Sequence, residues 1–209
     1  MSADMAWERI LGWLDGHAPA TIEYLGIPAD PSDIKSVQEA LSVVLPADLV
    51  AWWERSNGAA LKPSGHPFQL LPGYSLYTAE EALRGRGVWL QVWRDDAIAL
   101  GQYSSEDYAR VGARPAGAHA GMWLPSWLPI AGSGGGTDLF VDLRPGPRHG
   151  CVREFDKASA DGDVRWDGIT AMLLDVAESL ETGRPLDGER PHVTDGLLHW
   201  ERGVRYDDE

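Results

Sequence analysis

Cysteine is scarce and long apolar runs are missing in this sequence of 209 residues, and no N-terminal export signal is expected. The single cysteine, Cys151, excludes an internal disulfide framework and a cysteine-rich metal site, and we expect it to be a small buried side chain. No apolar run approaches the roughly 18–20 residues that a membrane-spanning helix needs. The N-terminal segment carries Asp4 and Glu8 and lacks a basic region, so it does not resemble a signal peptide. We therefore expect a cytoplasmic protein without a membrane partner.

Basic residues are also scarce. The chain has 18 Lys and Arg against 32 Asp and Glu, which gives a formal charge of −14. Such a surface repels phosphate groups, so nucleic acid is not an expected ligand. It would attract a basic protein and accelerate the encounter, although a high net charge also serves plain solubility. The charge therefore favours a basic protein partner and leaves the oligomeric state open.

A catalytic or metal-binding set is missing too. His192 and His199 are seven residues apart, and no histidine pair has the i, i+4 spacing of a zinc helix. Ser133 lies in a glycine turn followed by a strand pattern, whereas a nucleophile elbow or a phosphate loop continues into a helix. Asp138 and Asp142 would lie about 13 Å apart on one strand face, too far for a glycosidase pair, and are expected to be solvated. The sequence predicts no enzyme activity, no cofactor and no metal.

Amphipathic helices are predicted by apolar residues that recur every three to four positions. The predicted helices cover residues 3–15, 32–44, 46–57, 78–94 and 166–182. The second helix is expected to place Val44 on its buried side. Asn57-Gly58 and Gly183 end two of these helices, because glycine readily adopts the left-handed conformation of a helix C-terminus.

Strands are predicted where short apolar segments lie between Gly and Pro residues. The predicted strands are residues 68–71, 97–100, 127–131, 137–143 and 150–155, followed by a hairpin over 193–200 that turns at Asp195-Gly196. The three strands between 127 and 155 follow one another through short turns, which indicates an antiparallel meander. The stretch 95–121 is rich in Gly and Ala and is expected to be loop-like, as a binding loop or around the strand at 97–100.

Two motifs are informative in combination. The first is Leu45-Pro46 followed by an aromatic residue and Asn57-Gly58, and the second is a strand, a glycine turn and an alternating strand with aspartates at 138 and 142. In this order they resemble the SUKH superfamily. The positions that match are Pro46, Trp53, Gly58, Trp127, Pro129, Gly136, Asp138 and Asp142. Each motif is short, but their order and spacing together are fairly specific.

The resemblance implies an α+β fold, with a mostly antiparallel central sheet and helices packed on one side. It covers residues 28–183, so that 1–27 would be an N-terminal helical extension and 184–209 a linker with a C-terminal hairpin and tail. The superfamily contains fungal regulators of cell-wall synthesis and bacterial immunity proteins that neutralise toxins, and it is not known for catalysis.

Six residues are candidate contacts for a protein partner: Trp52, Asp95, Asp96, Glu106, Asp107 and Trp123. Trp52 and Trp53 project about 100° apart on a helix, so Trp53 is expected in the core and Trp52 at the rim, where a large ring can anchor a partner. Packing of Trp52 on a neighbouring helix is the alternative. Trp123 is expected to border a groove. The four acids lie in predicted loops, where they would meet Lys or Arg on a partner or simply be solvated.

Three functional hypotheses follow. The first is an immunity protein that occludes the active site of a basic toxin domain. The second is a scaffold or regulatory binding module in cell-wall assembly or another complex. The third is an unrecognised enzyme, which requires a polar, enclosed pocket with perturbed ionisable groups.

Overall fold

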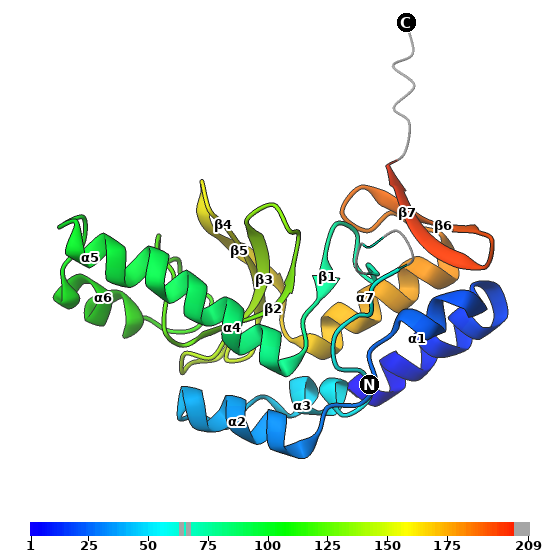
Figure 1. Ribbon diagram of the computed structural model, residues 1–209, viewed down its shortest axis with the longest axis horizontal. Coiled ribbons are helices and arrows are strands. Elements are labelled where there is room, and N and C mark those ends of the chain that lie inside the picture. The colour runs from blue at the N-terminus through cyan, green and yellow to red at the C-terminus, as the bar shows by residue number, and fades with distance from the viewer. Residues whose placement is uncertain (63–64, 66–67, 203–209) are drawn as a thin grey trace, which may run out of the picture.

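The computed structural model describes residues 1–62, 65 and 68–202, and Figure 1 shows their arrangement. Its centre is a five-stranded antiparallel sheet in chain order: β1 (Ser75–Leu76), β2 (Trp127–Gly132), β3 (Thr137–Asp142), β4 (Val152–Asp156) and β5 (Ala160–Trp166). The predicted meander over 127–155 is confirmed, and β5 extends it. The predicted strand at 68–71 is wrong, because only Leu71 forms a bridge, to Tyr74, and β1 begins later.

The helices follow the predicted periodicity closely. They are α1 (Ala3–His17), η1 (Pro19–Tyr24), α2 (Pro31–Leu41), α3 (Ala47–Trp53), α4 (Ala79–Leu90), η2 (Gln91–Asp96), α5 (Ala97–Ala99), α6 (Ser105–Gly112) and α7 (Ile169–Thr182). Val44 was expected on the buried face of the second helix, but it is 80% exposed. Helix α2 ends at Leu41 because Ser42 adopts the left-handed conformation, and Val44 lies beyond that turn.

The main core lies between one face of the sheet and helices α1, α3 and α7. Trp7 and Ile10 of α1, Val176 of α7 and Val141 of β3 belong to one continuous cluster of buried side chains. Helix α1 therefore packs into the same core as the family-like region. The predicted α+β fold is confirmed. None of the helices in the described part of the chain is long and apolar enough to cross a membrane.

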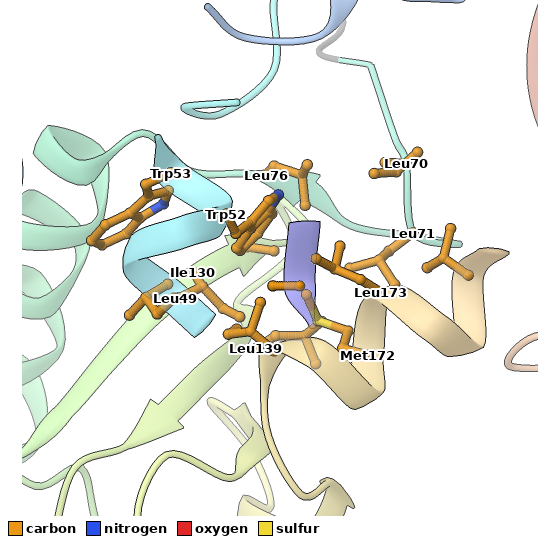
Figure 2. Close-up of a cluster of buried hydrophobic side chains, with 14 of the residues drawn as sticks. Leu49, Trp52, Trp53, Leu70, Leu71, Leu76, Ile130, Leu139, Met172 and Leu173 are labelled. Carbon is orange, nitrogen blue, oxygen red and sulfur yellow. The ribbon is translucent and has the colours of Figure 1, made fainter. Parts of the chain in front are cut away.

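Trp52 was expected at the rim of the fold, but the structure buries it. It is 1% exposed, and Trp53 beside it is also buried. Helix α3 contacts both α1 and α7 besides packing on the sheet, so two of its faces are covered and both rings find apolar neighbours. Figure 2 shows Trp52 inside the cluster with Leu49 and Leu76. The alternative, packing of Trp52 on a neighbouring helix, describes the structure.

The opposite face of the sheet carries a second cluster, formed mainly by aromatic rings. The ring of Trp127 stacks on Phe140 at 4.2 Å between centroids, and Phe155 packs beside them. Trp123 is completely buried among these rings, so the expectation that it borders a groove is wrong. It is held there because Phe140 of the central strand β3 offers an apolar platform on the face that was expected to be solvated.

The segment 95–121 is the predicted loop only in part, because residues 100–104 and 113–121 have no helix or strand and the rest is helical. Its first part is helical, as η2, α5 and α6, and the predicted strand at 97–100 is wrong because Ala97–Ala99 forms α5. Ser104 begins α6 by accepting a hydrogen bond from the backbone N–H of Asp107, while the Asp107 carboxylate accepts one from the backbone N–H of Ser104. This reciprocal capping box satisfies two N–H groups of the first turn. Together α5 and α6 form the end of the molecule far from α1 (Figure 1).

The matched motif positions have structural roles. Pro46 precedes the first residue of α3, where its missing N–H leaves no bond unmade. Gly58 has a φ of 81°, and a Cβ there would lie 2.7 Å from the Cγ2 of Thr78. Pro129 of β2 packs under Gly85 of α4, 3.4 Å from where a Cβ would stand. These residues let loops and helices approach the sheet closely.

The C-terminal hairpin is confirmed, with its turn at Asp195-Gly196. It consists of β6 (Glu189–Thr194) and β7 (Leu197–Arg202), which form a separate two-stranded sheet. Leu198 belongs to the main core, and its backbone N–H donates a hydrogen bond of 2.8 Å to the Thr21 hydroxyl. His192 and His199 face each other across the two strands. The hairpin is therefore anchored to the domain through η1.

Candidate functional site

Residues 88–112, which we call the helical arm, carry three of the nine exposed large apolar side chains of the described chain. Helix α4 continues through the π-helical turn η2 into α5, and α6 then returns beside them (Figure 1). Val88, Val92 and Leu100 on this arm are 59%, 50% and 73% exposed. Apolar side chains that gather in solvent mark interaction surfaces, and π-turns inside helices are frequent at functional sites. The arm is therefore the candidate interaction surface.

Two hollows are lined mainly by residues of the arm. The first, which we call the tryptophan groove, has a volume of about 470 Å³ and is lined by Trp89, Val92, Trp93, Ala97, Gln102 and Lys157. The second, which we call the α6 hollow, has a volume of about 600 Å³ and is lined by Arg94, Asp95, Ile98, Ser105, Tyr108, Ala109, Gly112, Pro125 and Ser126. Both volumes fall within the range of about 300–1,000 Å³ that is usual for ligand pockets.

The four predicted acidic contacts all lie on the arm, although on helices and not on loops. Asp95 pairs with Arg94 at 2.7 Å, and Asp96 accepts a hydrogen bond of 3.1 Å from Gln91. Glu106 is exposed. Asp107 caps α6 as described above. Of the four, Asp95 lines a hollow directly.

Asp107 also pairs with Arg110, at 2.6 Å. Hydrogen bonds from the Ser104 hydroxyl, the Arg110 guanidinium and the Ser104 backbone lower the pKa of its carboxyl to about 2. Asp107 is therefore already engaged in starting α6, and the acids left for a partner are Asp95, Asp96 and Glu106.

Asp138 lies buried where β3 passes beneath the arm, contrary to the expectation that it is solvated. Its carboxylate accepts hydrogen bonds from the Trp89 indole N–H at 2.6 Å and from the Tyr77 hydroxyl at 3.0 Å. Burial raises the pKa of this carboxyl, and these two bonds counteract the rise. Asp138 therefore fixes the ring that lines the tryptophan groove. Beside it, Gly136 has a φ of 97° and leaves room for the side chain of Lys157.

Asp142 is also buried, and its partners explain why. Its carboxylate accepts hydrogen bonds from Arg144 at 2.6 and 3.0 Å and from the backbone N–H of Gly117 at 2.9 Å. Arg153 lies 3.6 Å away and pairs with Asp161 at 2.5 Å. Burial raises the pKa of Asp142, but the hydrogen bonds and the charge of Arg144 outweigh it, so the pKa lies below its ordinary value. This cluster ties the chain around residue 117 to the sheet.

A hollow away from the arm is lined by charged side chains that pair with one another. A polar cleft of about 590 Å³ lies between the sheet and the hairpin, but its Arg165 is paired with Glu154 and Asp187, and Tyr74 donates its hydroxyl hydrogen to Glu154. Within the described residues, no group of three or more His, Cys, Asp or Glu side chains could hold a metal ion. Cys151 is buried, and burial raises the pKa of its thiol to about 11, which leaves it protonated and unreactive.

Sequence reasoning missed the side chains that shape the two hollows, chiefly Trp89, Trp93 and Tyr108. A signal for the first two was present, because Val88-Trp89 and Val92-Trp93 are four residues apart and place four large apolar groups along one helix. One helix face can bury only part of that surface. Trp52 and Trp123, the two predicted tryptophan contacts, lie in the two cores instead.

Comparisons with known proteins agree on one family. The model described as the SMI1/KNR4 family (SUKH-1) matches residues 28–182. A KNR4/SMI1 homolog of Yarrowia lipolytica is 26% identical over 218 residues, covering 83% of this chain and 30% of that protein. A glucan synthesis regulatory protein of Neurospora crassa is 25% identical over 210 residues, covering 86% and 38%. The cell wall assembly regulator SMI1 of Saccharomyces cerevisiae is 23% identical over 214 residues, covering 86% and 40%. The chain thus spans less than half the length of these relatives.

Proposed function

The chain belongs to the SMI1/KNR4 family (SUKH-1), and from that premise we propose that it is a non-catalytic domain that binds a protein partner through the helical arm. The observation that carries the proposal is the exposure of Val88, Val92 and Leu100 beside two hollows on one arm. When a partner covers such a side chain, the binding free energy becomes more favourable by about 25 cal/mol for each Å² of apolar surface buried. Membership of a family whose named relatives are regulators supports a binding role without catalysis.

We propose further that the partner is basic and that the chain is an immunity protein, which neutralises a toxin by covering its active site in the cytoplasm. The formal charge of −14 and the exposed Asp95, Asp96 and Glu106 on the arm support this proposal. Opposite charges on two proteins accelerate their encounter, and interfaces of this type bury about 1,600 Å² in total. Inhibition would require no bond to form or break.

The test is growth rescue in cells that express a toxin encoded beside this gene. A triple variant with Asp95, Asp96 and Glu106 changed to Lys should lose rescue, because the arm would then repel a basic partner. The matched control changes the same amount of charge at the far end of the molecule, on α1 and η1. It carries Glu8→Lys, Asp15→Lys and Glu23→Lys, all at exposed positions.

The control should rescue as well as the wild type. Growth rescue that survives the charge reversal on the arm would overturn the proposal that the arm is the binding surface. Failure of the wild type to bind or block any neighbouring toxin would overturn the immunity proposal and leave the binding role.

A second candidate function is a scaffold or regulatory module in cell-wall assembly or another complex. The specific observation in its favour is that the relatives named above are described as regulators of glucan synthesis or of cell wall assembly. In that case the arm would bind more than one partner with modest affinity, and the chain would not rescue any toxin. Binding of several wall-synthesis proteins that the arm reversal abolishes would favour it.

A further inference from the structure

A small pocket lies between helix α4 and the glycine turn that joins β2 to β3. It has a volume of about 300 Å³, and we call it the Asp138 pocket. Its lining consists of three glycines, of Tyr77, Val88 and Trp89, and of Asp138. Two of the glycines, Gly134 and Gly136, have φ values of 72° and 97° and present no side chain to the pocket. The volume is at the lower end of the range for ligand sites, so the pocket has room for one side chain of another protein.

Asp138 differs from the other buried acids of the described chain. Asp142 pairs with Arg144 at 2.6 Å. Asp161 pairs with Arg153 at 2.5 Å. Asp138 is 6% exposed and forms an ion pair with no Lys, Arg or His of the described residues. Because buried charges are normally paired, this carboxylate points to a cation from outside the chain.

The donors that reach Asp138 from within the chain are neutral. Its Oδ1 accepts a hydrogen bond from the Tyr77 hydroxyl, and its Oδ2 accepts one from the Trp89 indole N–H. A carboxylate offers about four acceptor sites, so both oxygens can accept a further donor. Lys157 lies against Gly136 beside the pocket, but it lines the tryptophan groove and forms no ion pair with Asp138.

The electrostatic environment of the pocket is negative. Burial, the charge of Asp138 and the charge of Glu81 at the start of α4 all raise the pKa of the Tyr77 hydroxyl. Tyr77 therefore keeps its proton at neutral pH and donates it to Asp138, while its oxygen can still accept a bond. An incoming cation would meet a carboxylate, a neutral hydroxyl and apolar walls.

From this arrangement we infer that the Asp138 pocket receives a lysine side chain of a protein partner. This inference rests on the proposed function, because the pocket meets the helical arm at Val88 and Trp89, and it names one contact of that interaction. A lysine ammonium is a compact charge with three donors, which would bind the carboxylate and the Tyr77 oxygen. The aliphatic stem would lie along Val88, which is 59% exposed. Arginine fits less well, because its fork binds both carboxylate oxygens at once and each already holds a donor.

The experiment uses the full chain and three small probes: N-acetyl-lysine methylamide and its norleucine and arginine counterparts. Norleucine has the same four-carbon stem as lysine and no ammonium group. Binding is followed by NMR of the tryptophan indole N–H groups. Trp89 is the reporter because its N–H donates to Asp138, and Trp166 is the internal control because its N–H donates to Asp175, at 2.8 Å.

The lysine probe should shift the Trp89 signal to saturation and leave the Trp166 signal unchanged. The norleucine probe should bind at least about tenfold more weakly, because a hydrogen bond to a charged group contributes about 1.5–3 kcal/mol. The arginine probe should bind more weakly than the lysine probe.

Asp138→Asn removes the charge and keeps the size of the side chain. It should weaken the lysine probe by at least about tenfold, measured as the further movement of the Trp89 signal during titration. Asp163→Asn is the matched control, because it removes the same charge from a side chain that is 96% exposed. The control should bind the probe within about threefold of the wild type.

Val88→Lys supplies a competing ammonium from the chain itself, and it should also weaken the lysine probe by at least about tenfold. The substitution suits an exposed helix position, so this variant remains informative should Asp138→Asn misfold. Val44→Lys is its matched control, because Val44 is 80% exposed and does not line the pocket. An unchanged Trp166 signal shows that each variant is folded.

Four results would overturn the inference: no shift at Trp89, equal binding of the lysine and norleucine probes, tighter binding of the arginine probe, or equal binding by wild type and Asp138→Asn. Growth rescue separates the inference from the proposed function. Rescue kept in Asp138→Asn and Val88→Lys but lost on charge reversal of the arm would remove the lysine contact and leave the proposed function. Specific binding of the lysine probe by a chain that blocks no neighbouring toxin would keep the pocket and overturn the immunity proposal.

Discussion

Asp142 provides the sharpest test of the fold, because the sequence predicts a solvated acid where the structure has a buried ion cluster. Asp142→Ala would leave the buried guanidinium of Arg144 without its carboxylate partner and the half-buried backbone N–H of Gly117 without its acceptor. Breaking a buried ion pair costs about 3–5 kcal/mol. For a domain of this size, a loss of 1 kcal/mol lowers Tm by about 2–4 °C, so we expect a decrease of roughly 6–20 °C.

Urea unfolding followed by tryptophan fluorescence measures this free energy. Asp163→Asn is the matched control, because Asp163 lies on β5 of the same sheet, its side chain is 96% exposed, and its described ion pair is with His119. The control should change the free energy of unfolding by no more than about 0.5 kcal/mol. A loss below about 1 kcal/mol for Asp142→Ala would refute the buried cluster, since that is the result expected of a solvated acid.

The same cluster fixes the pH dependence. The pKa of Asp142 is lowered in the folded state, so the native state binds fewer protons at this site than the unfolded state. Its stabilisation is fully present above the unfolded pKa of about 3.9 and is lost as the pH falls through the folded pKa. The difference in unfolding free energy between wild type and Asp142→Asn should therefore shrink between about pH 5 and pH 2. A difference that stays constant over this range would contradict the assigned partners.

Three further substitutions test other parts of the structure by the same unfolding measurement. Gly26→Ala would place a Cβ 2.2 Å from the backbone oxygen of Asn57 and should lower the free energy of unfolding by about 1–3 kcal/mol. Gly12→Ala, where the Cβ meets open space, should not destabilise the protein. Equal effects of the two substitutions would contradict the close approach of Gly26 to Asn57. Trp52→Ala should lower the free energy of unfolding by about 3–5 kcal/mol. A loss below about 1 kcal/mol would indicate that Trp52 lies at the surface. Tyr108→Phe should leave stability unchanged or raise it by up to about 1 kcal/mol, because the hydroxyl has no described partner, and a clear loss would reveal one.

Local signals in the sequence were sufficient for α1, α2, α4, α7 and the meander, but not for α5 and α6, which lie in a stretch predicted to be loop-like. Helix α7 follows from the spacing of Ile169, Leu173, Val176 and Leu180, all of which are buried, and Gly183 ends it in the left-handed conformation. These features depend on residues within a few positions of one another, so a single sequence contains all the information. The same holds for the hairpin turn at Asp195-Gly196, where both residues have positive φ.

The second layer of the fold, meaning the cluster of aromatic rings on the opposite face of the sheet, depends on contacts that local sequence patterns do not encode. The alternation of β3 was recognised, but the face with Asp138, Phe140 and Asp142 was assigned to solvent because two of its three residues are acidic. The structure covers that face with rings such as Trp123, and donors far away in the chain reach each acid, namely Trp89 for Asp138 and the backbone N–H of Gly117 for Asp142, beside the nearby Arg144. An aromatic residue between two acids was the available hint that this face is not solvated.

This second layer also determines how the helical arm can bind. Trp89 stacks on Trp123 at 5.4 Å between ring centroids and donates its N–H to Asp138, so both its ring plane and its rotation are fixed before any partner arrives. Trp93 packs edge-on against Phe155 at 5.1 Å. A partner that contacts these rings loses little free energy to their ordering, which costs about 0.5–1.5 kcal/mol for each mobile side chain that is immobilised. In the interaction that we propose, the buried Asp138 holds the tryptophan groove in the shape that the partner would contact.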